Sequence, residues 1–190
     1  MGSGRTVSSA ESRFESFAMS VFIALLRAVN VGGTGKLPMS DLSALCTKLG
    51  FKNVRTYIAS GNVIFDSRLA EAAIRRKLEA ALTRVLGKPA DVIVRTAAEL
   101  QCVLNANPFP DAEPAKVGVY FQSEPVNKSK ATQAKGPDGE EVRLGKREFY
   151  IHFPLGMGRS KLKLPAGVGT MRNINTVAKL VQMAATTDRE

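Results

Sequence analysis

Hydrophobic positions change their spacing several times along the first half of the chain, and most of the changes fall at segments that contain glycine or proline. A nearly continuous apolar run over 21–28 predicts a buried strand. Apolar residues at helical spacing follow over 39–49 and 69–86, and a glycine stands where each of these helices should end. Three shorter runs rich in β-forming residues predict further strands. They cover 54–59, 62–66 and 91–95.

This order of strand, helix, strand, strand, helix, strand is that of the ferredoxin-like βαββαβ arrangement. Its usual form is a four-stranded antiparallel sheet with two helices on one face. We therefore expect an α+β protein whose first, ferredoxin-like lobe covers 19–107. Thr96 and Glu99 form a capping-box pattern that predicts one more helix, toward Asn105.

The second half is more irregular. It has a predicted strand over 116–121 and a predicted hairpin over 141–153, with its tip near Gly145. A loop over 162–169 should lead into a closing helix over 172–185. We expect these elements to form a second, smaller α+β lobe, 108–190, packed on the first.

The 190 residues are 44% hydrophobic, which is ample for a core, and no apolar run approaches the roughly 18 residues of a membrane span. Residues 1–18 are rich in Ser, Gly and Arg. We expect them to be a disordered leader or an added tail before a natural start at Met19. Cys46 and Cys102 fall on apolar helix faces, so both are expected to be buried, reduced thiols in a cytoplasmic protein.

The formal net charge of +10 is large for this length and unevenly distributed. Residues 125–163 hold nine basic and four acidic side chains. Such a surface attracts polyanions, although a solvated face that aids solubility explains it equally well.

Four polar corners, three of them with glycine, stand at predicted strand ends, at 27–33, 60–62, 156–161 and 172–176. They combine exposed backbone N–H groups with Arg, Lys, Asn or Ser donors and almost no carboxylates. This chemistry favours an anion, such as a phosphate, over a metal. The candidate ligand-binding residues are Arg27, Asn30, Gly32, Gly33, Lys36, Ser60, Gly61, Asn62, Arg159, Ser160, Lys161, Arg172, Asn173 and Asn175.

Each corner also has a structural interpretation. The segment 30–36 lacks the spacing of a phosphate-binding P-loop, and Lys161 occupies the third glycine position of a dinucleotide fingerprint. Arg27, the one charge in an apolar strand, needs either a ligand or an Asp or Glu partner. Arg172 is expected to begin the last helix, capped by Asn173 or Thr170, or to brace a carboxylate of the other lobe.

One histidine, His152, and two separate cysteines cannot assemble the usual zinc ligands, so the sequence predicts no metal site and no cofactor. No nucleophile and base stand in a recognisable arrangement. The catalytic residues, if the protein is an enzyme, are therefore left unassigned, as is the role of His152.

The four corners resemble those of the bacterial domain-of-unknown-function family 1697. The resemblance is carried by the runs 24–33, 56–63, 158–162 and 172–177, and it extends over nearly all of 20–185. Two positions depart from the family pattern: Ala28 replaces an expected glycine, and Ile174 an expected tryptophan. The resemblance implies a small cytoplasmic bacterial protein with a ferredoxin-like first lobe, and it implies no reaction.

Three functions remain open. The first is binding of a small, phosphate-bearing anion in a basic cleft between the lobes. The second is weak, salt-dependent binding of nucleic acid, for which the strand around Phe65 offers one aromatic where RNA-recognition domains present several. The third is a non-catalytic protein-interaction module, in which the motif residues are buried and hydrogen-bonded to one another.

Overall fold

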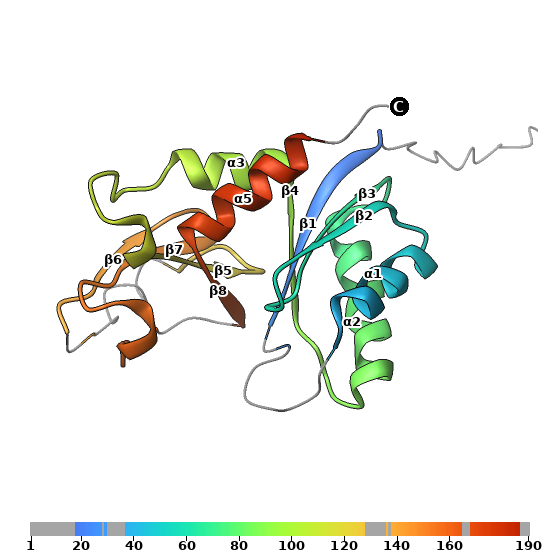
Figure 1. Ribbon diagram of the computed structural model, residues 1–190, viewed down its shortest axis with the longest axis horizontal. Coiled ribbons are helices and arrows are strands. Elements are labelled where there is room, and N and C mark those ends of the chain that lie inside the picture. The colour runs from blue at the N-terminus through green and yellow to red at the C-terminus, as the bar shows by residue number, and fades with distance from the viewer. Residues whose placement is uncertain are drawn as a thin grey trace, which may run out of the picture.

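The computed structural model describes residues 18–27, 29, 37–127, 136, 138–164 and 168–186. This part of the chain is an α+β structure of two antiparallel, four-stranded sheets and four α-helices (Figure 1). The strand order is β2-β3-β1-β4 in the first sheet and β6-β7-β5-β8 in the second. None of the helices described has both the length and the apolar character needed to cross a membrane.

Each sheet takes all of its strands from one half of the chain. The strands of the first sheet are β1 (Ser20–Leu26), β2 (Lys52–Tyr57), β3 (Asn62–Ser67) and β4 (Val92–Thr96). Those of the second are β5 (Val117–Gln122), β6 (Glu141–Leu144), β7 (Glu148–His152) and β8 (Gly169–Asn173). The helices are α1 (Met39–Lys48), α2 (Glu71–Leu86), α3 (Ala97–Asn105) and α5 (Ile174–Ala185), with short 3-10 turns η1 (Pro114–Lys116) and η2 (Met157–Arg159).

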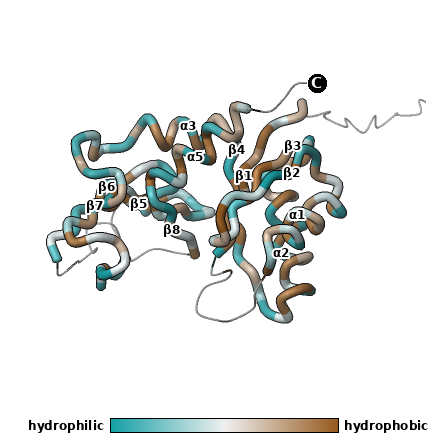
Figure 2. The backbone as a smooth tube through the Cα atoms, in the orientation of Figure 1, coloured by the Kyte–Doolittle hydropathy of each residue, from teal (hydrophilic) through white to brown (hydrophobic). Residues whose placement is uncertain are grey.

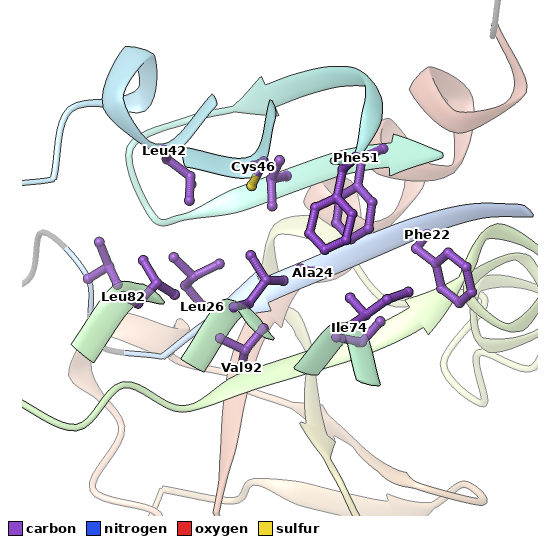
Figure 3. Packing of buried hydrophobic residues seen from close by; sticks show 14 of the residues in the cluster. Phe22, Ala24, Leu26, Leu42, Cys46, Phe51, Ile74, Leu82 and Val92 are labelled. Carbon is purple, nitrogen blue, oxygen red and sulfur yellow. The ribbon is translucent and has the colours of Figure 1, made fainter. Parts of the chain in front are cut away.

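One face of the first sheet packs against α1 and α2. Alternate residues of β1 and β3 point to this face, where Phe65 stacks on Phe51 with ring centroids 4.2 Å apart. Leu42 and Cys46 of α1 and Ile74 of α2 complete the cluster, which Figure 3 shows from close by. Along both helices, hydrophobic and hydrophilic stretches alternate, so that one side is buried and the other is solvated (Figure 2).

The other face of the first sheet shares a core with the second sheet. The helices α3 and α5 lie side by side in this layer and contact both sheets (Figure 1). Ile23 and Ile64 come from the first sheet, Val119 and Phe121 from the second, and Leu180 from α5. The two halves of the chain are thus joined by a continuous apolar layer rather than by a linker alone.

The far face of the second sheet has a smaller core. Side chains alternate between the two faces along β7, and Phe149 and Ile151 gather on this face together with Phe153. Their cover is the irregular chain around Leu162 and Leu164 instead of a helix.

The sequence predicted most elements within two or three residues and missed one strand. β8 was expected to be a loop followed by the start of a helix, but Arg172 lies on a strand paired with Val119. The helix α5 begins two residues later, at Ile174. Cys46 is buried as expected, whereas Cys102 is exposed, because it lies on the side of α3 away from the core.

Candidate functional site

Arg172 joins the second sheet to the corner between β2 and β3. Its side chain is buried, and its Nε donates a hydrogen bond to Asn62 Oδ1 at 2.6 Å. Its Nη2 donates to the carbonyl oxygens of Leu26 (2.9 Å), Ser60 (3.0 Å) and Gly61 (3.3 Å). We call these five residues the Arg172 lock. It brings together two of the four predicted corners and the end of β1.

The remaining donors of the guanidinium stay within β8. Nη1 donates to Thr170 Oγ1 at 2.7 Å and to the carbonyl oxygen of Met171 at 2.8 Å. No carboxylate of the described chain lies within 4 Å of Arg172, so its partners are neutral oxygens rather than the carboxylate that one of the sequence alternatives gave it. Burial lowers the pKa of the guanidinium to about 10, which leaves it charged at neutral pH.

Gly61 and Asn62 shape the acceptor side of the lock. Gly61 has φ +77°, and a Cβ added there would lie 2.9 Å from the Cβ of Leu26, so both conformation and space require glycine. The side-chain amide of Asn62 donates to the carbonyl oxygen of Tyr57 (2.8 Å) and to Ser60 Oγ (3.1 Å). With its Oδ1 bound to Arg172, each polar atom of this buried side chain has a partner.

Asn173 has a structural role next to the lock. Its Oδ1 accepts a hydrogen bond from the N–H of Asn175 and thereby caps α5, as one of the two sequence alternatives predicted. Its Nδ2 donates to the carbonyl oxygens of Pro114 (3.3 Å) and Ala115 (2.9 Å), which ties the start of α5 to η1.

The other predicted residues are not gathered at the lock. Arg27 is half exposed and forms an ion pair with Asp91 at 3.0 Å. Ser160 donates to a carboxylate oxygen of Glu140, while Arg159 and Lys161 are exposed on the turn around η2. The predicted residues Asn30, Gly32, Gly33 and Lys36 lie outside the described residues. A ligand role for this set stays a prediction.

A cavity of about 580 Å³ lies between α3 and the tip of the β6–β7 hairpin. None of the predicted ligand residues that the structure describes is part of its wall. We call it the hairpin pocket. It is lined by Arg95, Ala98, Glu99, Cys102, Val103, Ala106, Leu144, Gly145, Lys146, Arg147, Glu148 and Tyr150.

Arg147 organises the polar side of the hairpin pocket. Its Nη1 and Nη2 donate to the two carboxylate oxygens of Glu71, at 3.0 and 2.5 Å, and its Nη1 lies 3.6 Å from Glu99 Oε1. Its Nε and Nη2 donate to the carbonyl oxygen of Ser123. The hydrogen bonds to Glu71 raise the pKa of Arg147. This ion cluster links the hairpin to the first turns of α2 and α3.

Two further polar side chains of the wall are buried and hydrogen-bonded to backbone carbonyl groups. Arg95 donates to the carbonyl oxygens of Val94 (2.8 Å) and Gln122 (2.5 Å), and desolvation lowers its pKa to about 10. The hydroxyl of Tyr150 donates to the carbonyl oxygen of Val103 at 2.8 Å, and burial raises its pKa. These groups fix the pocket wall and leave little hydrogen-bonding capacity for a ligand.

Glu148 holds the hairpin tip itself, since its carboxylate accepts hydrogen bonds from the N–H groups of Lys146 (3.0 Å) and Arg147 (3.1 Å). Lys146 is exposed and has no ion pair among the described residues. It is therefore the cation of the wall most available to a bound molecule. The sequence predicted the hairpin and the Thr96–Glu99 capping box, both of which are confirmed, but no pattern marked their junction as a pocket.

The described chain has no cluster of three or more His, Cys, Asp or Glu side chains able to hold a metal ion. His152 is half-buried, and its ring lies 5.7 Å from that of Phe109. The geometry gives it a packing role.

Taken together, the fold and the two regions define an α+β protein whose two antiparallel sheets share a core, with a pocket between α3 and the β6–β7 hairpin. The sequence over 19–150, well over half of the chain, matches the family described as "Protein of unknown function (DUF1697)". The chain belongs to this family, and the resemblance noted in the sequence is confirmed.

The fold is similar to that of a conserved bacterial protein from Streptococcus pneumoniae, with a TM-score of 0.70 and 24% sequence identity. The match covers 88% of this chain and 99% of the other. No curated protein matches the sequence significantly.

Proposed function

We propose that this protein binds a small organic acid, with an apolar body and one acidic head group, in the hairpin pocket. The observation that carries the proposal is the pocket itself, whose volume of about 580 Å³ lies within the range of roughly 300–1,000 Å³ usual for small-molecule sites. The pocket separates β4 and α3 of the first half from the β6–β7 hairpin of the second. The proposal thus keeps the expectation of a ligand between the two lobes. It assigns the binding to other residues than those expected from the sequence.

The wall of the pocket suits the body of such a ligand. Ala98, Cys102 and Ala106 form an exposed, small-residue side of α3, and Leu144 faces them from the hairpin at 40% exposure. A planar or branched apolar group would shield these side chains from water. The resulting burial supplies most of the affinity, at about 25 cal/mol per Å² of apolar surface.

The charge of the wall suits one acidic group. Arg95 and Arg147 already donate to protein oxygens, which leaves the Lys146 ammonium as the available cation at the rim. A carboxylate or a phosphate at that position would gain a charge-assisted hydrogen bond. A polyanion would instead meet the carboxylates of Glu99 and Glu148.

A thermal-shift and calorimetric comparison tests the proposal. Aromatic and branched aliphatic carboxylates are paired with their uncharged amides, and we expect the acids to stabilise the protein more than the amides. Ala98→Trp, which fills the pocket, should abolish binding, whereas Ala80→Trp on the exposed side of α2 should not. Lys146→Met should remove the preference for the acid. Equal binding of acids and amides, or binding that survives Ala98→Trp, would contradict the proposal.

We further propose that 19–107 forms a ferredoxin-like lobe and 108–190 a second lobe. Support for the first comes from the strand order β2-β3-β1-β4 with α1 and α2 on one face. Nucleic-acid binding finds less support, because α3 and α5 cover the sheet face that RNA-recognition domains leave open for base stacking.

A further inference from the structure

A second cavity lies at the opposite end of β3 from the Arg172 lock. It has a volume of about 470 Å³, and a neighbouring cavity of about 310 Å³ shares Ser67, Arg68 and Leu69 with it. We call the two together the α2 pocket, because both open beside the connection from β3 to α2. It belongs to neither of the regions described above.

Three cations from three separate segments surround the α2 pocket. Lys52 begins β2, Arg68 lies between β3 and α2, and Lys77 is on α2. All three side chains are exposed, and none has an ion pair among the described residues. This differs from Arg27, Arg143 and Arg147, which each have a carboxylate partner.

One carboxylate, that of Asp66, is part of the lining. Its Oδ2 accepts a hydrogen bond from Asn53 Nδ2 at 2.7 Å, and its Oδ1 is buried without a donor among the described residues. The lining therefore combines three exposed cations that have no ion pair among the described residues with one buried carboxylate. The three positive charges outnumber the single negative charge, so the balance favours an anionic guest.

The start of α2 adds to this field. The helix has 16 residues and begins after Ala70, which has no side-chain cap to offer, and Ala70 lies in the wall of the smaller cavity. Ser67 Oγ accepts from the N–H of Leu69 at 3.1 Å and so shapes the turn that leads into the helix. An anion in the pocket would lie near the positive end of the helix dipole as well as near the three cations.

Apolar side chains share the same pocket. Met19 is 48% exposed and Leu69 is 36% exposed, and the buried ring of Phe51 is part of the same wall. A phosphate attached to an apolar organic group would therefore contact both parts of the lining. Inorganic phosphate would contact only the cations.

We propose that the α2 pocket is a binding site for a small phosphate monoester. Lys52, Arg68 and Lys77 hold the phosphate group, and Met19, Phe51 and Leu69 contact its organic part. This site does not depend on ligand binding in the hairpin pocket.

Nuclear magnetic resonance titration of the full chain with phenyl phosphate tests this site, with inorganic phosphate and phenol as partial analogues. We expect saturable shifts of the amides of 67–72 and tighter binding of phenyl phosphate than of either analogue. Lys77→Met and Arg68→Met should each weaken binding by about tenfold, since each removes one charge-assisted contact. Lys88→Met, at an exposed position outside the pocket, is the matched control and should change nothing.

Three results would overturn the site: no saturable shift near 67–72, equal weakening by Lys88→Met, or equal binding of phenol and phenyl phosphate. Vesicles containing phosphatidic acid form a separate arm of the experiment. Binding to these vesicles without binding of phenyl phosphate would replace the soluble ligand by a membrane surface and would also contradict the proposal. Shifts confined to the hairpin pocket would do the same, while leaving the proposed function intact.

Discussion

The Arg172 lock and the hairpin pocket involve different strands of the second sheet: the lock is on β8 and the pocket is beside β6 and β7, on the other side of β5. The lock is made from residues that stood out in the sequence, and its buried guanidinium is surrounded by oxygens of the protein. The hairpin pocket is made from residues that the sequence did not predict as ligand-binding, and it holds a cavity. Three of the predicted ligand-binding residues, Gly61, Asn62 and Arg172, therefore lie where the two sheets are joined.

The difference has a simple physical origin. Strand ends leave backbone carbonyl groups that require donors once they are buried, and an Arg side chain can supply five N–H groups from one position. The same residue types serve anion binding when their donors stay free. The sequence shows the donors but not whether they are already used, so the two roles look alike until the partners are known.

Replacing Arg172 should have the largest effect in the molecule. Arg172→Met removes the guanidinium donors to Asn62 Oδ1 and to the carbonyl groups of Leu26, Ser60 and Gly61, so we expect a loss of about 3–5 kcal/mol in the free energy of unfolding. Arg172→Lys should lose nearly as much, because an ammonium cannot reproduce the planar set of donors. Urea unfolding measures both. A lock that mainly serves a ligand would instead leave stability within about 0.5 kcal/mol of the parent.

Gly61→Ala should come next and can be compared with Gly50→Ala. Both glycines have positive φ, +77° and +90°, but only Gly61 faces a close neighbour, the Cβ of Leu26. We expect Gly50→Ala to cost about 1 kcal/mol from backbone strain and Gly61→Ala about 2–4 kcal/mol from strain and overlap together. Thermal unfolding of the two variants gives the difference. Equal losses of stability would mean that the β2–β3 corner shifts to relieve the contact with Leu26. Such a shift would contradict the rigid geometry proposed for the Arg172 lock.

Gly61 and Arg172 also show which parts of the fold the sequence could predict. The turn at Gly61 and the flanking strands were predictable because glycine preference and β-forming residues act locally. The strand β8 was not, because Gly169–Asn173 has no alternation of its own and pairs with β5 through a partner some fifty residues away in sequence. The hairpin pocket was out of reach for the same reason: Ala98 and Leu144 meet only through tertiary packing.

Arg147→Met should have a moderate effect on the pocket side of the comparison. It removes the ion cluster with Glu71 and Glu99, whose side chains are 30% and 43% exposed, so solvent screening limits the loss to about 1–2 kcal/mol. The parent protein should lose part of this difference in 0.5 M NaCl, while the variant should not. Urea unfolding of the parent and the variant at two salt concentrations measures this salt dependence. A difference that does not respond to salt would assign the role of Arg147 to its hydrogen bonds with Ser123.

The smallest effect is expected at the exposed corner. Arg159→Met and Lys161→Met remove two solvated cations without ion pairs in the described chain, so stability should change by less than about 0.5 kcal/mol. Binding of acids to the hairpin pocket should also be unchanged, as isothermal calorimetry can measure. Loss of that binding in either variant would indicate that the ligand binds at the corner 156–161, as predicted from the sequence.

Mapping a bound organic acid on the backbone amides tests the central account most directly. We expect the shifts from the tightest acid of the thermal screen to fall on 98–106 and 144–150, around the hairpin pocket. The amides of Leu26, Gly61 and Arg172 should stay unchanged, because their region is fully bonded within the protein. Shifts centred on those three residues, without shifts of the hairpin amides, would show that the lock is the ligand site and would contradict the account.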